Sequence, residues 1–211
     1  MKQLTVPLPA YHRITQYLNY LNHLPESAPE NISATTIAEA LDLNDVVVRK
    51  DLACVSGHGK PKVGYLRIEL AAAISRFLGH EESYEAALVG AGRLGQALLT
   101  YENFAKYGLS IVIAFDTNPL IIGRRVGGAQ VFGVERIAEL CMRLGIKIGI
   151  ITAPGRAAQG ACDALVEGGV RRVWNFAPVP LKAPKDVVIK NEDMAASLAI
   201  LLKQDGKGTV G

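Results

Sequence analysis

A glycine-rich turn between an apolar strand and a helix constrains the fold of this chain more than any other feature of its sequence. Residues 86–89 have the composition of a buried strand, and a G-x-G-x-x-G pattern follows them. The pattern consists of Gly90, Ala91, Gly92, Arg93, Leu94 and Gly95. In such a turn the first glycine permits a tight bend, the second lets the backbone approach a pyrophosphate, and the third lets the helix pack on the sheet. The sequence therefore predicts a dinucleotide-binding turn, with a purely structural glycine turn as the alternative.

Strands and helices alternate over the rest of residues 84–190. The alternation is typical of an α/β fold with a Rossmann-like parallel sheet and helices on its faces. A final helix is expected over residues 191–203, followed by a frayed, glycine-rich tail. The other elements expected are helices over residues 94–106, 134–144 and 156–166, and strands over residues 109–115, 146–152, 170–176 and 187–189.

The acidic residue at the end of the second predicted strand favours one cofactor. Asp116 lies where a carboxylate bonds the adenosine ribose hydroxyls in dinucleotide-binding folds. A carboxylate at that position also repels a 2′-phosphate, so we expect NAD(H) rather than the phosphorylated cofactor. An ordinary cap of the turn before Asn118 is the alternative role.

Two loops after later strands are expected to line the nicotinamide side of the same site. Ligands of open α/β sheets lie outside the carboxyl ends of the strands. Both loops contain proline, and a role as plain connections without ligand contact is equally open. The expected lining residues are Thr152, Ala153, Pro154, Asn175, Phe176, Ala177 and Pro178, together with Tyr101 on the first helix.

Residues 1–80 have a different character, because short helices and turns predominate there. A short loop separates two helical segments, which is the helix-turn-helix pattern. Ser33 can cap the first of them, and Asn44 or Asp45 can cap the second. The glycines and the proline of residues 57–66 indicate a small hairpin, the wing. The helices expected here cover residues 11–24, 35–41, 46–55 and 68–78, and a polar link is expected at residues 79–83.

Basic side chains of the helix-turn-helix and of the wing predict binding to DNA. Arg49 and Lys50 lie on the second helix of the pair, which enters the major groove in such proteins, while loop lysines contact phosphates. A solvated charged surface is the alternative, and the net charge of +3 permits DNA binding without requiring it. The expected DNA-binding residues are Ser33, Arg49, Lys50, Lys60, Lys62 and Tyr65.

The sequence offers no catalytic machinery and no metal site. All 4 histidines precede the α/β region, so that region has no histidine for the acid-base step of hydride transfer. The 3 cysteines fit no metal-ligand or disulfide spacing, and Cys54 is expected to be packed and inert. We therefore expect a non-enzyme in a reducing, cytoplasmic setting. No signal peptide is visible, and no apolar run reaches the roughly 18 residues of a membrane span.

Several stretches together resemble the Rex family of redox-sensing transcriptional repressors over nearly the whole chain. They join the DNA-binding pattern to the nucleotide-binding pattern in the order that the family shows. The matching stretches are residues 48–52, 63–65, 88–95, 97–99, 114–116, 148–150, 157–159 and 175–178.

The resemblance implies a homodimer on double-stranded, palindromic operator DNA. It implies that residues 1–80 bind DNA and that residues 84–190 bind NAD(H). It also implies that residues 191–211 contain a domain-swapped helix that crosses to the partner. NADH is expected to release the operator, and NAD⁺ to permit binding. A pairing of Arg13 with Asp193 across protomers is one hypothesis for the switch, with unpaired surface charges as the alternative. An apolar wall near the nicotinamide is expected from Met194, Leu198 and Leu201.

Two other functions are open from the residues alone. An NAD-dependent dehydrogenase would share the glycine turn, but it needs an acid-base residue that the α/β region does not supply. A CoA-binding domain would share the glycine-rich first turn and the proline-ended loops. Asp116 and the attached DNA-binding pattern argue against this CoA-binding function.

Overall fold

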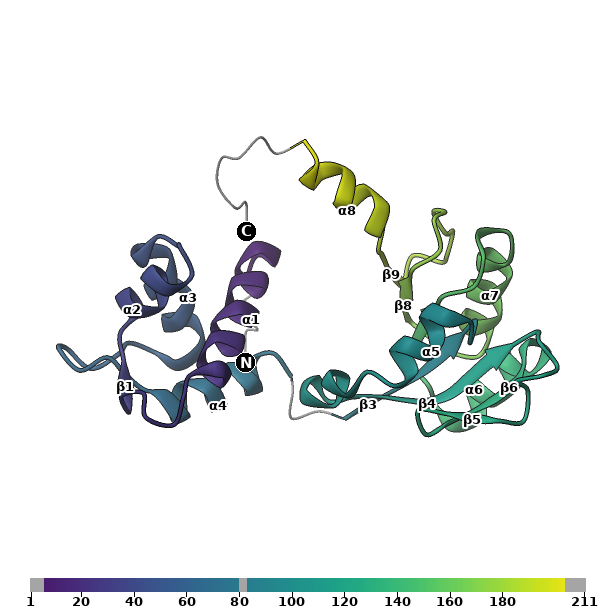
Figure 1. Ribbon diagram of the computed structural model, residues 1–211, viewed down its shortest axis with the longest axis horizontal. Helices are drawn as coiled ribbons and strands as arrows, with labels where there is room; N and C mark the ends of the chain where they lie inside the picture. Colours follow the sequence, from purple (N-terminus) through teal and green to yellow (C-terminus); the bar gives the residue numbers. More distant parts are fainter. Residues whose placement is uncertain (1–5, 80–82, 204–211) are drawn as a thin grey trace. The chain divides into compact units, whose positions relative to one another are not determined.

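The computed structural model describes residues 6–79 and 83–203, and the chain divides into two compact units, Met1–Glu82 and Ser83–Gly211 (Figure 1). Residues 80–82 of the predicted link and residues 204–211 of the predicted tail lie outside the described residues.

The N-terminal unit combines four helices with a small two-stranded sheet. Its elements are α1 (Leu8–His23), β1 (Asn31–Ile32), α2 (Ala34–Ala40), α3 (Asp45–Ser56), β2 (Tyr65–Leu66) and α4 (Arg67–Phe77). The Ser33 hydroxyl caps α2 by accepting from the Thr36 N–H at 2.9 Å. The Asn44 side chain caps α3 by accepting from two N–H groups of its first turn. The predicted helix-turn-helix is therefore present, and of the two candidate caps for α3 the structure uses Asn44.

The wing is completed by a strand that precedes the helix-turn-helix. β2 pairs antiparallel with β1, with Tyr65 opposite Ile32, and a separate bridge joins Lys60 to Gly64. Gly64 has a φ of +86°, and a Cβ on it would overlap the Ile32 carbonyl oxygen, so glycine is required there. The prediction of a self-contained hairpin over residues 57–66 is thus wrong in one respect. The loop closes on itself, but its strand pairs with β1, whose two residues are too few to show an alternating pattern.

A buried carboxylate joins α3 to α1. Asp51 accepts from the Arg13 guanidinium at 2.8 and 3.0 Å and from the Tyr17 hydroxyl at 2.9 Å. Tyr17 is fully buried and the Asp51 side chain is only 9% exposed, so Arg13 compensates a charge that water solvates poorly. Burial, and then the neighbouring Asp51 carboxylate, raise the pKa of Tyr17. This network fixes α3 on the core of the unit.

The C-terminal unit is a seven-stranded sheet with helices on both faces, which confirms the predicted Rossmann-like α/β fold. Its strands are β3 (Tyr84–Val89), β4 (Leu109–Asp116), β5 (Arg125–Val126), β6 (Ala129–Gly133), β7 (Ile148–Ile151), β8 (Arg172–Asn175) and β9 (Val188–Asn191). Its helices are α5 (Arg93–Leu99), the 3-10 helices η1 (Glu102–Tyr107) and η2 (Val134–Arg136), α6 (Ile137–Leu144), α7 (Gly155–Glu167) and α8 (Met194–Leu201). The strand order is β5-β6-β4-β3-β7-β8-β9, and only the β5–β6 pair is antiparallel.

The order of the strands reverses between β3 and β7. From β3 the chain moves outward through β4 to β6, then returns to β7 and moves outward through β8 to β9 on the other side. Ala87 and Val89 of β3 pack with α6 and α7 on one face, whereas Ala86 and Leu88 pack with Leu99 of α5 on the other. Connections that leave β3 and β7 toward opposite faces open a crevice at the carboxyl ends of these strands, where open α/β sheets bind ligands.

The first helix after the glycine turn is shorter than predicted. A helix over residues 94–106 was expected, but α5 ends at Leu99 and η1 follows it. A Cβ on Gly127 would overlap the Leu99 carbonyl oxygen, so the backbone of the β5–β6 turn lies against the end of α5. The Thr100 hydroxyl also donates to the Gln96 carbonyl at 3.0 Å. The helix therefore ends where another segment occupies the space beyond it.

Two further boundaries differ from the prediction. β5 and β6 form a hairpin that the sequence reading missed, although Gly127 and Gly128, with φ of +57° and +88°, are the residues that a two-residue hairpin turn requires. The last helix begins at Met194 rather than at residue 191, because β9 continues to Asn191 and the Asp193 carboxylate caps α8.

We expect Asp51→Asn to destabilise the N-terminal unit by about 1.5–3 kcal/mol, the contribution of hydrogen bonds to a charged group. Urea unfolding of the full chain, followed by circular dichroism, measures this change. Asp42→Asn is the control, because the Asp42 side chain is exposed and makes no hydrogen bond or ion pair with the other described residues. The control should change stability by less than about 0.5 kcal/mol. Equal stability of the two variants would show that Asp51 does not hold α3 in place.

Candidate functional site

The glycine turn has the three properties that the sequence predicts for it. Gly90 has a φ of +102°, and a Cβ on it would lie 2.6 Å from the Ala153 nitrogen. A Cβ on Gly95 would overlap the Gly90 carbonyl oxygen, so this glycine allows α5 to lie against the turn. A Cβ on Gly92 would meet no atom within 4 Å, so the space in front of it is open. The turn is thus closed on its inner side and accessible at Gly92.

A hydroxyl group connects this turn to the end of the neighbouring strand. Thr152, directly after β7, donates from Oγ1 to the Gly90 carbonyl oxygen at 2.6 Å. The Thr152 N–H donates to the Val89 carbonyl oxygen at 2.9 Å. The loop after β7 and the glycine turn after β3 are therefore held as one rigid edge at the point where the strand order reverses.

A cavity of about 570 Å³ lies along this edge. It brings together six residues that the sequence analysis assigned to the cofactor, namely Gly90, Gly92, Asp116, Thr152, Ala153 and Pro154. The predicted residues Ala91, Arg93, Leu94 and Gly95 belong to the turn but do not line the cavity. Its volume is in the range of small-molecule and cofactor sites.

The apolar half of this cavity was missed by the sequence analysis. One side is lined by Val134 of η2 and by Ile137 at the start of α6. Small residues of α7 line the other side, at Ala157, Gly160, Ala161 and Ala164. Their spacing of three and four residues places them on one face of the helix, and that spacing was the available signal. The part of the cavity between Val134 and α7 is thus an apolar slot.

Asp116 caps the turn after β4 and also lines the cavity. Its Oδ1 accepts from the Asn118 N–H at 2.8 Å, which is the turn-capping role. The same residue lines the cavity at the end of β4. Only Oδ1 takes part in this hydrogen bond, so the turn fixes the carboxylate while Oδ2 can accept from a hydroxyl in the cavity.

The second predicted loop is placed differently. Asn175 is fully buried, and its Nδ2 donates to the carbonyl oxygens of Ala177 and Val179 and to Asn191 Oδ1. Its amide therefore holds the loop after β8 against β9. Phe176 lies against Trp174, with ring centroids 4.6 Å apart. Five more predicted residues do not line the cavity, namely Asn175, Phe176, Ala177, Pro178 and Tyr101.

Tyr101 belongs to a row of aromatic rings near the same loop. Its ring contacts Phe104 at 5.0 Å between centroids, and Phe104 contacts Trp174 at 5.9 Å. The Trp174 indole N–H donates to Glu192 Oε1 at 3.0 Å. The row connects the end of α5 with β8 and with the residues that lead into α8.

A second hollow, in the N-terminal unit, separates the helix-turn-helix from the wing. Its volume is about 480 Å³. Five of the six residues predicted to bind DNA line it, and Lys50 does not. These five are Ser33, Arg49, Lys60, Lys62 and Tyr65. The start of α2, an arginine of α3 and two wing lysines thus face one space that is open to an anionic partner.

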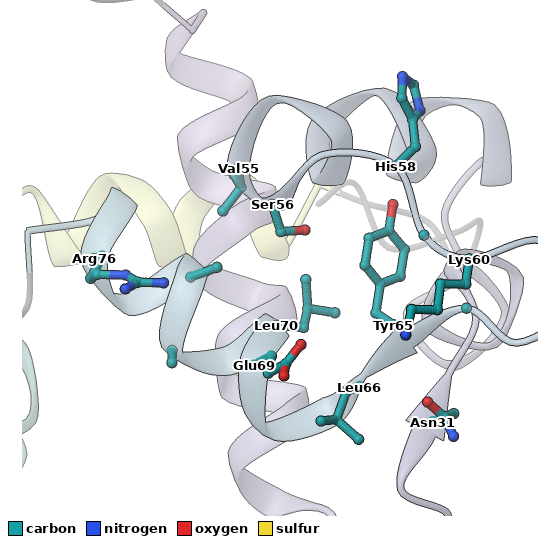
Figure 2. A pocket seen from close by; sticks show the side chains of 14 residues that line it. Asn31, Val55, Ser56, His58, Lys60, Tyr65, Leu66, Glu69, Leu70 and Arg76 are labelled. Atoms are coloured by element: carbon teal, nitrogen blue, oxygen red, sulfur yellow. The ribbon is translucent and has the colours of Figure 1, made fainter.

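A third hollow lies on the other side of the wing, between it and α4 (Figure 2). The Tyr65 ring lines both hollows, and its hydroxyl donates to the Gly57 carbonyl oxygen at 3.3 Å. A Cβ on Gly59 would lie 2.9 Å from this ring, so the wing loop passes closely over it. Tyr65 therefore packs against the wing loop and supports it, which adds a structural role to the predicted DNA contact.

Three other predicted features have definite places in the structure. Arg13 donates to Asp51 of its own unit, and Asp193 caps α8, while a pairing of the two across protomers stays a prediction. Cys54 is exposed, and the prediction that it is packed is wrong, because it lies on the outer side of α3. Cys141 and Cys162 are buried, and burial raises the pKa of Cys141 to about 11.

Within residues 6–79 and 83–203, no three His, Cys, Asp or Glu side chains form a group suited to a metal ion.

Family models match both halves of the chain. The model described as CoA binding domain covers residues 81–179, and the model described as putative DNA-binding protein N-terminus covers residues 5–53. A redox-sensing transcriptional repressor Rex from Porphyromonas gingivalis is 38% identical over 94% of this chain and 91% of its own length. The Rex repressor from Clostridium botulinum is 33% identical over 96% and 97% of the two chains. The chain belongs to the Rex family of redox-sensing transcriptional repressors.

Solved structures of a Rex-family repressor agree with this assignment. The protein RSP in complex with β-NAD⁺ and operator DNA is 32% identical and has a TM-score of 0.88, with 95% of this chain and 92% of RSP covered. The RSP complex with β-NADH gives a TM-score of 0.84, with 95% and 94% covered. In the described part of this Rex-family chain, no helix has the length and apolarity to cross a membrane.

The glycine turn yields a matched pair of variants. Gly95→Ala should destabilise the C-terminal unit by about 1–3 kcal/mol, the usual cost of overpacking, because its Cβ overlaps the Gly90 carbonyl oxygen. Gly92→Ala should leave stability within about 0.5 kcal/mol, because its Cβ meets open space and its φ of −72° suits alanine. Thermal unfolding measures both, and equal losses would contradict the different roles of the two glycines.

Proposed function

We propose that this chain is a homodimeric, cytoplasmic, NAD(H)-sensing transcriptional repressor that NADH releases from a palindromic DNA operator. The supporting observation is that the glycine turn, Asp116 and Thr152 meet at one cavity in a chain whose other unit is a winged helix. The RSP structures hold both NAD forms, and one of them also holds operator DNA. The proposal makes the chain a regulator rather than an enzyme, like the repressors to which it is similar.

The cavity suggests an orientation for the dinucleotide. The pyrophosphate lies against Gly92 and the N–H groups at the start of α5, where the helix dipole favours anions. Asp116 Oδ2 accepts from the adenosine ribose hydroxyls, and the adenine ring enters the apolar slot between Val134 and α7. The nicotinamide then extends past Pro154 toward Tyr101 and the loop of residues 175–178. When bound, the cofactor supplies no reaction here, and its oxidation state is the signal.

The C-terminal helix supports a dimer. α8 consists almost entirely of apolar residues, yet Met194, Leu198 and Leu201 are 62%, 55% and 62% exposed in the single chain. Apolar side chains of this density are normally covered by a partner. We propose that α8 is exchanged between protomers and forms an apolar wall beside the partner's nicotinamide. An apolar wall favours the neutral reduced ring over the oxidised cation, because burial of an unpaired charge is costly.

DNA binding is assigned to the hollow between the helix-turn-helix and the wing. α3 enters the major groove with Arg49 and Lys50, Ser33 and Tyr65 flank the groove, and Lys60 and Lys62 contact phosphates from the wing. A symmetric dimer places two such helices on two half-sites, which predicts a palindromic operator. NADH acts by binding more tightly to the dimer conformation that does not fit the operator.

CoA is the second candidate ligand, because the matching model for residues 81–179 is described as a CoA binding domain. CoA and NAD(H) share an adenosine and a pyrophosphate, so the cavity suits the adenine end of both. They differ at the ribose, where CoA carries a 3′-phosphate that the Asp116 carboxylate would repel. Asp116 therefore favours NAD(H).

Removal of the Asp116 carboxylate should weaken NADH binding about 10- to 150-fold, since charge-assisted hydrogen bonds contribute about 1.5–3 kcal/mol. Isothermal titration of wild type, Asp116→Ala and Asp163→Ala with NADH, NAD⁺ and CoA measures this effect. Asp163 is exposed and does not line the cavity, so Asp163→Ala should bind as wild type does. Wild-type affinity of Asp116→Ala, or tighter binding of CoA than of NADH, would reject the NAD(H) assignment.

Saturating NADH should weaken operator binding at least about 10-fold relative to NAD⁺, which corresponds to a coupling free energy of about 1.4 kcal/mol. Fluorescence anisotropy at fixed salt measures it, with a duplex that the full chain has selected from a randomised pool. Gly92→Val is the control, because its side chain fills the space for the pyrophosphate and should abolish the response to NADH without abolishing DNA binding. Equal affinity of wild type with NADH, with NAD⁺ and with neither would end the sensor hypothesis.

A further inference from the structure

The Arg49 side chain is held between two acceptors on different helices. Its Nη2 donates to Asp45 Oδ2 at 2.8 Å, one turn earlier on α3, and to Thr35 Oγ1 at 3.3 Å, on the first turn of α2. Nη2 carries two hydrogens, so both are engaged. The Arg49 side chain is nevertheless 61% exposed, and it lines the hollow between the helix-turn-helix and the wing. The guanidinium is therefore presented to a ligand in a fixed orientation.

This orientation limits what Arg49 can contact. A guanidinium has two forked edges, Nε with Nη2 and Nη1 with Nη2, and both include Nη2. A two-bond contact with the guanine edge must therefore displace one of the present acceptors. A single bond to a phosphate through Nη1 or Nε needs no displacement, but it brings a phosphate charge close to the Asp45 carboxylate, which opposes it.

The start of α3 keeps Asp45 in place. Asn44 caps the helix, and Asp45 is its first residue, where the helix dipole stabilises a carboxylate. Thr35 is fixed by the capped first turn of α2. The two acceptors thus belong to the two helices of the helix-turn-helix, and neither depends on a mobile loop.

We propose that Asp45 is a specificity-determining residue that positions Arg49 for the operator. Asp45 discourages contacts of Arg49 with phosphates at arbitrary sequences, and it releases Arg49 only where a base edge offers two acceptors. Asp45 acts through Arg49 and needs no contact with DNA of its own. The inference rests on the proposed DNA-binding function of α2, α3 and the wing, and it adds a residue that selects among sequences.

The test compares two duplexes, one selected by the wild-type full chain from a randomised pool and one scrambled duplex of the same composition. Asp45→Asn should bind the scrambled duplex about 3- to 10-fold more tightly, with a salt dependence steeper by about 0.9 in log K against log salt, as for one added phosphate contact. Affinity for the selected duplex should rise less, so the ratio of the two affinities falls. Fluorescence anisotropy over a series of salt concentrations gives all of these values.

Two controls separate this role from net charge and from helix stability. Asp42→Asn removes the same charge from the turn between α2 and α3, where the side chain has no hydrogen-bonding or ion-pair partner among the described residues, and it should leave the ratio of affinities unchanged. In an Arg49→Ala background, Asp45→Asn should no longer change the ratio or the salt dependence. Thermal unfolding identifies any variant that has lost its fold, a loss that would by itself lower both affinities together.

The outcomes distinguish this inference from the function on which it rests. A wild-type chain that selects no duplex from the pool overturns the proposed DNA binding and this inference with it. A wild-type chain that selects a duplex, with an unchanged affinity ratio for Asp45→Asn, overturns the role of Asp45 alone. The same conclusion follows if Asp42→Asn lowers the ratio equally, or if Asp45→Asn keeps its effect without Arg49.

Discussion

The nucleotide cavity depends on the close approach of two backbone segments that side chains would keep apart. Gly90 lies against Ala153, and Gly95 lies against the Gly90 carbonyl. The Thr152 hydroxyl then donates to that same carbonyl and connects the carboxyl ends of β3 and β7. Because these strands lead to opposite halves of the sheet, this one edge positions Asp116 and the apolar slot of α7 around a common space. The rest of the site is arranged around a contact between main-chain atoms.

Features that depend on a few neighbouring residues could be predicted from the sequence. The glycine turn, the acidic end of β4, and the caps at Ser33 and Asn44 all follow from local chemistry, and the structure contains each of them. Local chemistry also gives the parallel sheet, because apolar strands that alternate with helices have few other ways to bury their side chains. The family resemblance added the dimer and the signal, which local chemistry alone does not contain.

Features that depend on distant partners could not be predicted. The pairing of β1 with β2 joins two-residue strands on either side of the helix-turn-helix. Two residues are too few for the sequence of either strand to indicate which segment it pairs with. Asp51 looks like an exposed charge beside Arg49 and Lys50 until the fold brings Arg13 and Tyr17 to it. Asn175 follows a strand as a ligand-binding residue would, yet its amide is used by the loop itself. In these cases one sequence position suits two roles, and only the tertiary contacts decide between them.

The hairpin of β5 and β6 also determines how one side of the sheet ends. A parallel sheet presents unpaired N–H and C=O groups along its outermost strand, and such an edge can recruit a strand from another molecule. β5 turns back on β6 through Gly127 and Gly128, runs antiparallel to it, and is only two residues long, with exposed Arg125 at its start. The border that remains is short and charged. The same hairpin whose Gly127 lies against the end of α5 thus leaves little free strand edge on this side of the sheet for another molecule to pair with.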